Sequence, residues 1–421
     1  MDATPAPAPP ALTVNARRYR LPSRPSVVIC WDGCDPAYIE AAAQTGVIPV
    51  VERMQQQGFD ATALATVPTF TNPNNMSIVT GAPPEVHGVS GNFYLDRETG
   101  QDVMMVDGKP LRCPTILGEF SQAGVKVAAV TAKDKLLKAL SRGLDGIALS
   151  AEKAADCTVE THGISDVPAM VGRPTPSPYS ADLSLFVLDA GIRLLERDDA
   201  DLLYLSLSDY VQHMHAPGTP EANGFMRAVD ERLGRLLDLG AVVGVVADHG
   251  MSDMARDDDS ANVLFLGDRL DAAFGAGTLR VICPITDPFV RHHGALGGFV
   301  RVYGQQGAPD LTEVLNFLRT LPEVEEALTR QDVCRRFQLP ADREGDIAVI
   351  ARPGVALGAH AADHDLSQLA GVRLRSHGGL AERDVPFIIS EPVTPAYRAK
   401  AAEGLNSHDI FDFVLNGVAR P

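Results

Sequence analysis

The sequence predicts an α/β fold, with a doubly wound, mostly parallel sheet and a smaller α+β domain inserted into it. Two observations lead to this prediction. Short, continuous apolar runs recur along the chain, as expected for strands that helices cover on both faces. The stretches between these runs carry apolar residues at helical spacing. With 421 residues, of which 45% are hydrophobic, the chain is long enough for a large core and a second domain.

The first 24 residues differ from the rest of the chain. They are rich in proline and alanine and carry a basic patch made of Arg17, Arg18 and Arg20. A segment of this composition buries little apolar surface. We therefore expect residues 1–24 to form a flexible N-terminal arm.

Five apolar runs are expected to form strands of the main sheet. Each is short enough for a strand, and they occupy residues 26–31, 125–130, 202–207, 242–247 and 386–390. Helices are expected over residues 182–196 and 221–239, where Phe225, Val229 and Leu233 recur at helical spacing. The core domain is predicted to comprise residues 25–253 and 375–421.

Residues 254–374 have a different pattern, with more loops. A strand is expected at residues 345–351 and a helix near residues 311–321. The chain then returns to the core pattern with Ser376-His377-Gly378-Gly379 and a final apolar run. We predict that residues 254–374 form the inserted cap domain.

The charge of the chain excludes several classes of partner. Its formal net charge is −17, so binding to nucleic acid or to an anionic membrane would work against the protein's own field. No apolar run reaches the roughly 18 residues of a spanning helix, and the N-terminus has no basic start followed by an apolar core. We expect a soluble, cytoplasmic protein that binds neither nucleic acid nor membranes, and we leave open whether it forms a homodimer.

Side chains that can bind metals follow the apolar runs, where the predicted strands end. In an open α/β sheet, ligands bind at the carboxyl ends of the strands. Asp and His ligands suit Zn²⁺ or Mn²⁺, with Fe²⁺ also open, and two such ions take about three protein ligands each. The spacing alone does not decide between His213 and His215 as a ligand. The six side chains expected to form this two-metal site are Asp32, Asp209, His213, Asp248, His249 and His377.

A helix is expected to begin next to this site. Asn72 and Pro73 suit its N-cap and first turn, and Gly81 suits its end. Thr71 would then lie at the helix N-terminus, where free N–H groups and the helix dipole favour an anion. Taken alone, Thr71 is a capping residue. Beside two metals, which favour its alkoxide, we predict that it is the catalytic nucleophile.

Two lysines follow the run 125–130. Lys133 and Lys135 point to one side if the chain is extended there. Such a pair in isolation is usually solvated. In a chain of net charge −17, however, two ammonium groups beside a metal site suit a small substrate with a second acidic end, such as a carboxylate. In the predicted cap, Arg291 and His293 are candidates for substrate contacts, and His292 is left open.

The ordered set of these motifs resembles the alkaline phosphatase superfamily, and most closely its nucleotide pyrophosphatase/phosphodiesterase branch. The resemblance spans residues 26–390. It implies two zinc ions and a hydrogen bond from Asn92 to a phosphoryl oxygen. One ion would be held by Asp32, Thr71, Asp248 and His249, and the other by Asp209, His213 and His377. The motifs that carry the resemblance are Asp32, Pro-Thr-x-Thr leading into Ser-Ile-Val-Thr-Gly, Gly88-x-x-Gly91-Asn92, Asp209 with His213, Asp248-His249 and His377.

The sequence departs from this branch at two motifs. The branch typically has Thr-Phe-Pro-Asn-His after the first threonine and Asp-x-x-Gly-His at the second carboxylate. Here the residues read Thr71-Asn72-Pro73-Asn74-Asn75 and Asp209-Tyr210-Val211-Gln212-His213. Aromatic residues make up only 6% of the chain, with a single tryptophan, and no slot for a nucleotide base is evident.

Members of the superfamily that cleave phosphonoacetate are similar in having lysines that grip the substrate carboxylate, as Lys133 and Lys135 would. The resemblance therefore implies a hydrolase that cleaves the C–P bond of phosphonoacetate to acetate and phosphate. We expect the reaction to pass through a phospho-Thr71 intermediate, with the enolate leaving group stabilised by the lysines or a metal. The alternative is a phosphodiesterase or nucleotide pyrophosphatase with the same metal site.

Overall fold

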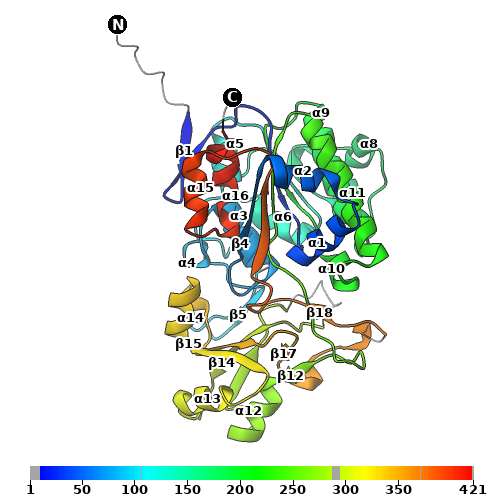
Figure 1. Cartoon of the computed structure of the whole chain (residues 1–421). Coiled ribbons are helices and arrows are strands. Elements are labelled where there is room, and N and C mark those ends of the chain that lie inside the picture. The colour runs from blue at the N-terminus through cyan, green and yellow to red at the C-terminus, as the bar shows by residue number, and fades with distance from the viewer. Residues whose placement is uncertain (1–9, 106, 287–293, 370, 420–421) are drawn as a thin grey trace.

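A computed structural model describes residues 10–105, 107–286, 294–369 and 371–419. The molecule has two parts, a large α/β part that contains both the first and the last described residues and a smaller part below it (Figure 1). The large part is built on a seven-stranded sheet in the order β4-β19-β10-β3-β9-β7-β8. These strands are β3 (Ser26–Cys30), β4 (Phe59–Leu64), β7 (Val127–Thr131), β8 (Ile147–Ser150), β9 (Leu202–Ser206), β10 (Val242–Val246) and β19 (Asp384–Ile389).

The sheet is mostly parallel, which confirms the predicted fold class. Strands β10, β3, β9, β7 and β8 run parallel to one another, and only β19 runs antiparallel to its two neighbours. Strands β3, β9 and β10 are buried along their whole length, as their continuous apolar runs predict. Because β10, β3 and β9 are adjacent and parallel, their carboxyl ends lie side by side at one edge of the sheet.

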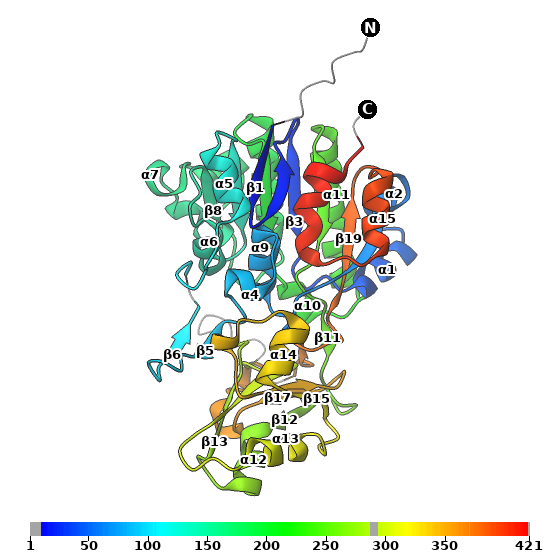
Figure 2. The ribbon, with the colours of Figure 1, turned by 90° about the vertical axis from the view of Figure 1, so that its left-hand side faces the viewer.

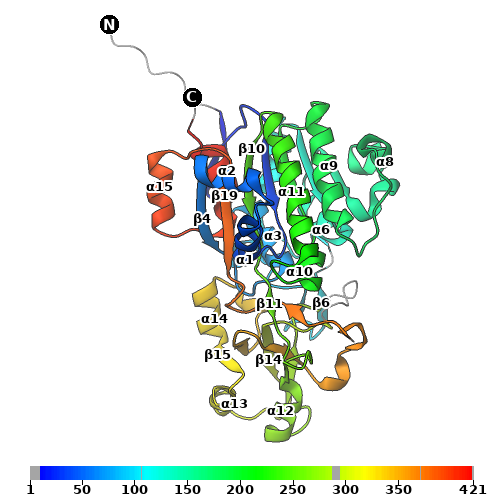
Figure 3. The same ribbon diagram turned by 45° about the vertical axis from the view of Figure 1, so that its right-hand side comes forward.

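Helices cover both faces of this sheet. On one face, α9 and α11 pack side by side, with α1 and α2 against α11 (Figure 3). On the other face, α3 contacts α5, α6 and α16. The predicted helices at residues 182–196 and 221–239 are confirmed within a residue. The bounds are α1 (Pro36–Gln44), α2 (Pro49–Gln57), α3 (Thr71–Thr80), α5 (Ile116–Gln122), α6 (Asp134–Leu140), α9 (Asp182–Glu196), α11 (Pro220–Asp238) and α16 (Ile410–Asp412).

The predicted flexible arm is wrong for residues 11–20. Strands β1 (Ala11–Val14) and β2 (Arg17–Arg20) form an antiparallel hairpin. Val14 and Tyr19 are buried against the core, because alternation along each strand places apolar side chains on one face. Arg17 forms an ion pair with Asp409 at 2.8 Å. Composition alone missed this alternation.

The smaller part has its own sheet and its own apolar cluster. Four antiparallel strands lie in the order β13-β14-β16-β15, and β12 pairs in parallel with β17. The strands are β12 (Val263–Phe265), β13 (Leu279–Ile282), β14 (Phe299–Gly304), β15 (Val324–Thr329), β16 (Ile347–Ala351) and β17 (Ala356–Gly358). The helices of this part are α12 (Leu266–Phe274), α13 (Leu311–Leu318) and α14 (Arg330–Phe337).

We propose that residues 254–374 are an inserted cap domain. The chain leaves the large part through β11 (Ser252–Asp253) and returns through β18 (Arg375–Ser376), and these two short strands pair with each other. From the core side, β5 (Phe93–Leu95) contacts β13 of the cap, and the hairpin that β5 forms with β6 (Asp102–Met104) lies between the two parts (Figure 2).

The remaining elements are short. Within the part of the chain that the structure describes, no helix has the length and apolar character needed to cross a bilayer. The short helices are α4 (Pro84–His87), α7 (Val159–His162), α8 (Val167–Val171), α10 (Tyr210–Met214) and α15 (Pro395–Ala402), joined by 3-10 turns and, after α16, a π-helical turn at Phe413–Gly417.

Candidate active site

Three carboxylates meet where adjacent parallel strands end. Asp32 follows β3, Asp209 follows β9, and Asp248 follows β10. With nearby histidines they form two groups, and within each group the candidate ligand atoms lie within 4.8 Å of one another. The structure thus brings together all six side chains that the sequence predicted for a two-metal site.

The first group consists of Asp32, Asp248 and His249, all buried. Nε2 of His249 lies 3.3 Å from Oδ1 of Asp32 and 3.8 Å from Oδ2 of Asp248. The Asp248 carboxylate accepts hydrogen bonds from the Gly33 amide at 3.3 Å and from Nδ2 of Asn75 at 3.0 Å. These bonds orient Asp248 toward its group.

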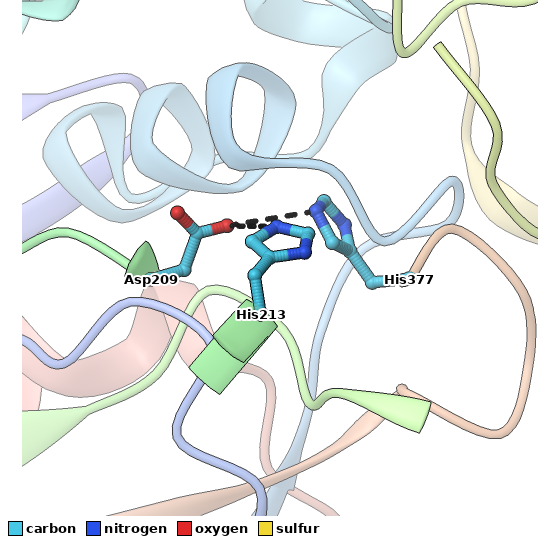
Figure 4. A group of neighbouring side chains, drawn as sticks. All are labelled: Asp209, His213 and His377. Carbon is cyan, nitrogen blue, oxygen red and sulfur yellow. Dashed lines mark hydrogen bonds and ion pairs between the residues drawn. The ribbon is translucent and has the colours of Figure 1, made fainter. Parts of the chain in front are cut away.

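The second group consists of Asp209, His213 and His377 (Figure 4). Helix α10 places His213 one turn after Asp209, with its Nε2 at 2.9 Å from Oδ2 of the carboxylate. Nε2 of His377 lies 3.8 Å from the same oxygen. His213 rather than His215 belongs to the group; the backbone carbonyl of His215 accepts a hydrogen bond from Tyr38.

All three imidazoles are anchored in the same way. Nδ1 of His213 donates to the Arg375 carbonyl at 2.6 Å, Nδ1 of His249 to Gly250 at 2.9 Å, and Nδ1 of His377 to Thr69 at 2.7 Å. The rings of His249 and His377 stack at 3.6 Å, and burial together with the neighbouring histidines holds the pKa of His377 well below its usual value. Because Nδ1 of each ring donates to a carbonyl, it is Nε2 that faces the carboxylates, as in metal-ligating histidines.

The donor set fits a divalent cation. The Nε2 lone pairs and the carboxylate oxygens face one another at short range, which is unfavourable unless a positive charge lies among them. Burial and the charges of Asp209 and Asp248 raise the pKa of Asp32 well above its usual value. Mixed Asp and His donors match the ligand preference of zinc and related ions.

We expect Asp32→Asn to raise the melting temperature of the metal-free protein, although it removes a metal ligand. Because the pKa of Asp32 is raised in the folded state, the stability tied to its protonated form is present below the unfolded pKa of about 4 and is lost as the pH rises through the folded pKa. The neutral amide avoids this loss, and in a chain of 421 residues roughly 1 kcal/mol corresponds to a shift of about 1 °C in melting temperature. Thermal unfolding in excess chelator measures the effect at pH 7.5, and the difference should shrink near pH 4. An Asn variant that melts below the wild type at pH 7.5 would contradict the fit to a cation.

Thr71 lies at the start of α3 and beside the first group. Its Oγ1 is 3.2 Å from Nε2 of His249. The helix begins two residues earlier than predicted, with Phe70 rather than Asn72 as N-cap, and ends at Gly81 in the left-handed conformation at φ 62°. The side chain of Phe70 makes no capping bond, so sequence rules favoured the polar Asn72.

Asn75 is a site residue that the sequence analysis did not select. Its Nδ2 donates to both the Thr71 carbonyl at 3.0 Å and the Asp248 carboxylate. Its Oδ1 accepts bonds from Tyr204 at 2.7 Å and Ser206 at 3.0 Å. Asn75 therefore links the helix that Thr71 begins to Asp248, a candidate metal ligand, and only the three-dimensional arrangement shows this link.

A cavity of about 750 Å³ opens over both groups. Its wall includes Asp32, Thr71, Asp209 and His377. Asn92 also lines it, and its Nδ2 donates to the Ile285 carbonyl at 3.1 Å. That bond fixes which end of the amide is the donor.

Lys133 and Lys135 line the same cavity. They do not lie on one extended strand as assumed, because α6 starts at Asp134 and Lys133 is its N-cap. Nζ of Lys133 donates to the Pro178 carbonyl at 2.7 Å, lies 3.7 Å from Oε2 of Glu152 and sits 5.1 Å from the centre of the Tyr179 ring. Additional lysines on this wall, Lys138 and Lys153, were not predicted.

The predicted substrate contacts in the cap cannot be placed. Arg291 and His293, together with His292, lie outside the described residues.

The fold and the two donor groups define the class of the protein, a metallo-hydrolase with an alkaline-phosphatase-like fold. Residues 26–378 match the family described as type I phosphodiesterase / nucleotide pyrophosphatase, and the chain belongs to this family. The resemblance drawn from the sequence motifs is thereby confirmed.

Solved structures give a narrower likeness. The phosphonoacetate hydrolase of Sinorhizobium meliloti 1021, in complex with phosphonoformate, is 44% identical to this chain, with a TM-score of 0.92 over 98% of this chain and 100% of that one. The complex of the same enzyme with phosphonoacetate gives 43%, a TM-score of 0.91 and the same coverage.

Other relatives are more distant. Murine ectonucleotide pyrophosphatase/phosphodiesterase 5, in complex with AMP, shares 18% identity at a TM-score of 0.63 over 95% of this chain and 96% of that one, which shows the fold alone. An uncharacterized pyrophosphatase/phosphodiesterase of Schizosaccharomyces pombe is 25% identical over 241 residues, or 54% of this chain. That match spans only 44% of the yeast protein's length.

Proposed function

We propose that this protein is a two-zinc hydrolase that cleaves the C–P bond of phosphonoacetate and releases acetate and phosphate. The observation that carries the proposal is a single cavity lined by Thr71, by members of both donor groups and by Lys133 and Lys135. The relative at 44% identity, solved with phosphonoformate and with phosphonoacetate, supports the same substrate class.

Each metal ion would be held by one donor group. Asp32, Asp248 and His249 would hold one ion together with Oγ1 of Thr71. The second group is Asp209, His213 and His377. When bound, such ions offset the charge of the phosphonate oxygens and favour the alkoxide form of a hydroxyl. Mn²⁺ and Fe²⁺ accept similar donors, so the metal content of the purified protein decides the identity of the ion.

Thr71 performs the first step. Its Oγ1 releases its proton to solvent water and forms a bond to phosphorus, while the C–P bond breaks on the opposite side of the phosphorus atom. Asn92 donates its second amide N–H to a phosphoryl oxygen, since its first is bound to the Ile285 carbonyl. The product of this step is phospho-Thr71.

The leaving group is carbon and needs stabilisation. The electron pair of the C–P bond moves onto the methylene carbon and into the adjacent carboxylate as an enolate. Lys133 and Lys135 bind this carboxylate, and their charge stabilises the enolate more than the ground state. The carbon takes up a proton from solvent water and becomes the methyl group of acetate, which balances the proton that Thr71 released. Water then hydrolyses phospho-Thr71, which releases phosphate and restores the hydroxyl.

We expect Lys133→Met and Lys135→Met each to raise KM and lower kcat for phosphonoacetate, with a loss in kcat/KM of about 10- to 100-fold, or ~1.4–2.7 kcal/mol. Each variant removes an ammonium group from the substrate carboxylate. Hydrolysis of bis-p-nitrophenyl phosphate, which has no carboxylate, should be unchanged.

Lys126→Met is the matched control for the lysine variants. Lys126 precedes β7, at the opposite end of the strand from the site, and its Nζ pairs with Asp198 at 2.9 Å. Its replacement should leave both reactions unaltered. Unchanged kinetics in both cavity variants would remove these lysines from the substrate site.

Phosphodiester hydrolysis is the second candidate function, and one observation favours it. The sequence offered no evident aromatic slot, but Phe70, Tyr179 and Tyr210 line the cavity. The centres of the Tyr179 and Tyr210 rings lie 6.4 Å apart, and such rings could stack on the aromatic group of a phosphodiester substrate.

A cytoplasmic location, a homodimer and the absence of nucleic-acid or membrane partners stay predictions from the sequence.

A further inference from the structure

We infer that Arg301, in the cap, is a positioning residue that holds Asn92 in place for the phosphoryl group. The inference rests on the proposed function, which assigns Asn92 to a phosphoryl oxygen. Arg301 does not line the cavity. It acts through the loop that carries Asn92.

Arg301 is a fully buried arginine on β14. Both it and Glu344 have side chains with no exposed surface. Nε of Arg301 donates to Oε2 of Glu344 at 2.7 Å, and Nη2 donates to Oε1. A buried ion pair of this kind contributes little net stability compared with apolar residues of the same size. Its presence is better explained by what the guanidinium holds.

The remaining donors of Arg301 reach the core loop that precedes and follows Asn92. Nη2 donates to the Ser90 carbonyl at 2.8 Å and to its hydroxyl at 3.1 Å. Nη1 donates to the Phe93 carbonyl at 3.3 Å. One planar group thus holds the loop on both sides of Asn92, and Glu344 fixes the plane of that group.

The cap also binds Asn92 directly. The Pro284 carbonyl accepts a hydrogen bond from the backbone N–H of Asn92 at 2.8 Å, and the Ile285 carbonyl accepts one from Nδ2 of its side chain. The loop packs tightly there, since a Cβ on Gly91 would lie 2.8 Å from Cβ of Pro284. Asn92 is a core residue whose position is set by the cap.

The same cap strand also packs against the loop of a predicted metal ligand. Just before β14, the Gly298 amide donates to the His377 carbonyl at 2.9 Å. A Cβ on Gly298 would come within 2.5 Å of the Gly379 nitrogen. Three residues later, Arg301 holds the Asn92 loop. Strand β14 therefore fixes the distance between the His377 loop and the phosphoryl donor.

Lysine cannot replace Arg301 in this role. It keeps the positive charge but lacks the rigid fork of donors that bonds Glu344 and two backbone carbonyls together. A shift of about 1 Å at a catalytic group can cost roughly 100-fold in rate. We expect Arg301→Lys to lower kcat for phosphonoacetate by about 10- to 100-fold and to weaken the binding of inorganic phosphate, with metal content unchanged.

A double-mutant cycle with Asn92→Ala separates positioning from folding. If Arg301 acts through Asn92, then Arg301→Lys should change kcat and the Kd of inorganic phosphate by no more than about twofold in the Asn92→Ala background. A purely structural role predicts the same loss in both backgrounds, and that result would overturn the inference. Isothermal titration with phosphate supplies a readout that does not depend on C–P cleavage.

Two further variants complete the experiment. Arg301→Met with Glu344→Leu replaces the ion pair by apolar side chains, so it should fold even if Arg301→Lys does not. Its effects on kcat and on the Kd of phosphate should likewise be lost in the Asn92→Ala background. Arg319→Lys is the matched control: Arg319 also holds a backbone carbonyl in the cap, that of Ala327, and should leave both readouts unchanged. If Asn92→Ala itself changes neither readout, the assigned role of Asn92 is wrong, which is a failure of the proposed function.

Discussion

Replacing Thr71 with alanine should abolish phosphate release from phosphonoacetate. Thr71 is the first residue of α3 and lines the cavity. Its Oγ1 lies 3.2 Å from Nε2 of His249. No other hydroxyl is assigned to attack phosphorus, so the variant loses the covalent step. Losses after removal of a catalytic nucleophile are on the order of 10⁴-fold or more. Steady-state phosphate release measures this loss.

Two controls define the result. Thr71→Ser keeps the hydroxyl and should retain part of the activity. Acid-quenched wild-type enzyme should carry a phosphoryl group on Thr71, detected by mass spectrometry of the peptide. Full turnover by Thr71→Ala with both metals still bound would show that another group attacks phosphorus.

Removing the metal ions is expected to stop turnover completely and to lower the melting temperature. Without cations, the carboxylates of Asp32, Asp209 and Asp248 repel one another in a buried site, and burial raises the pKa of both Asp32 and Asp248. A ligand at 100 times its Kd stabilises the folded state by about 2.7 kcal/mol. Activity and thermal unfolding are measured before chelation, in EDTA and after zinc is restored.

Restoring zinc after chelation shows how many ions each chain needs for activity. Activity should return in proportion to zinc until two ions are bound per chain, with calcium as the control ion because it prefers all-oxygen sites. Turnover that persists in EDTA at a metal content of zero would contradict the two-metal site.

The site was predictable from the sequence where it depends on strand ends. Asp32, Asp209 and Asp248 each follow a continuous apolar run, and adjacent parallel strands bring their carboxyl ends to one edge. His213 lies on α10, one turn after Asp209, and His249 directly follows Asp248. Local order along the chain was therefore enough to select these candidate ligands, apart from the choice between His213 and His215, which depends on how α10 turns. Their division into two groups, with His377 in the second, was implied by the family resemblance.

Other features depend on contacts that local sequence does not encode. Two of the three carbonyls that anchor the imidazoles come from distant parts of the chain, that of Arg375 for His213 and that of Thr69 for His377. Asn75 lies within the helix that Thr71 begins, and its role appears only when Tyr204 and Ser206 of β9 reach its Oδ1. The N-terminal hairpin was missed because average composition hides a period-two pattern as short as β1 and β2.

The sequence and the structure differ in which substrate class they favour. Lysines at the end of β7 predicted a carboxylate-bearing substrate, and the cavity contains them. No aromatic slot for a nucleotide base was evident from the sequence, but Tyr179 and Tyr210 also line the cavity. A scattered pair of tyrosines has no linear pattern, so the two substrate classes must be compared directly.

The most direct test is the rate of hydrolysis of phosphonoacetate against that of bis-p-nitrophenyl phosphate by the zinc-loaded enzyme, with phosphate and acetate both quantified. We predict equimolar acetate and phosphate from phosphonoacetate, with kcat/KM well above that for the diester. A faster reaction with the diester, and no acetate from phosphonoacetate, would contradict C–P hydrolysis and assign the metal site and Thr71 to a phosphodiesterase.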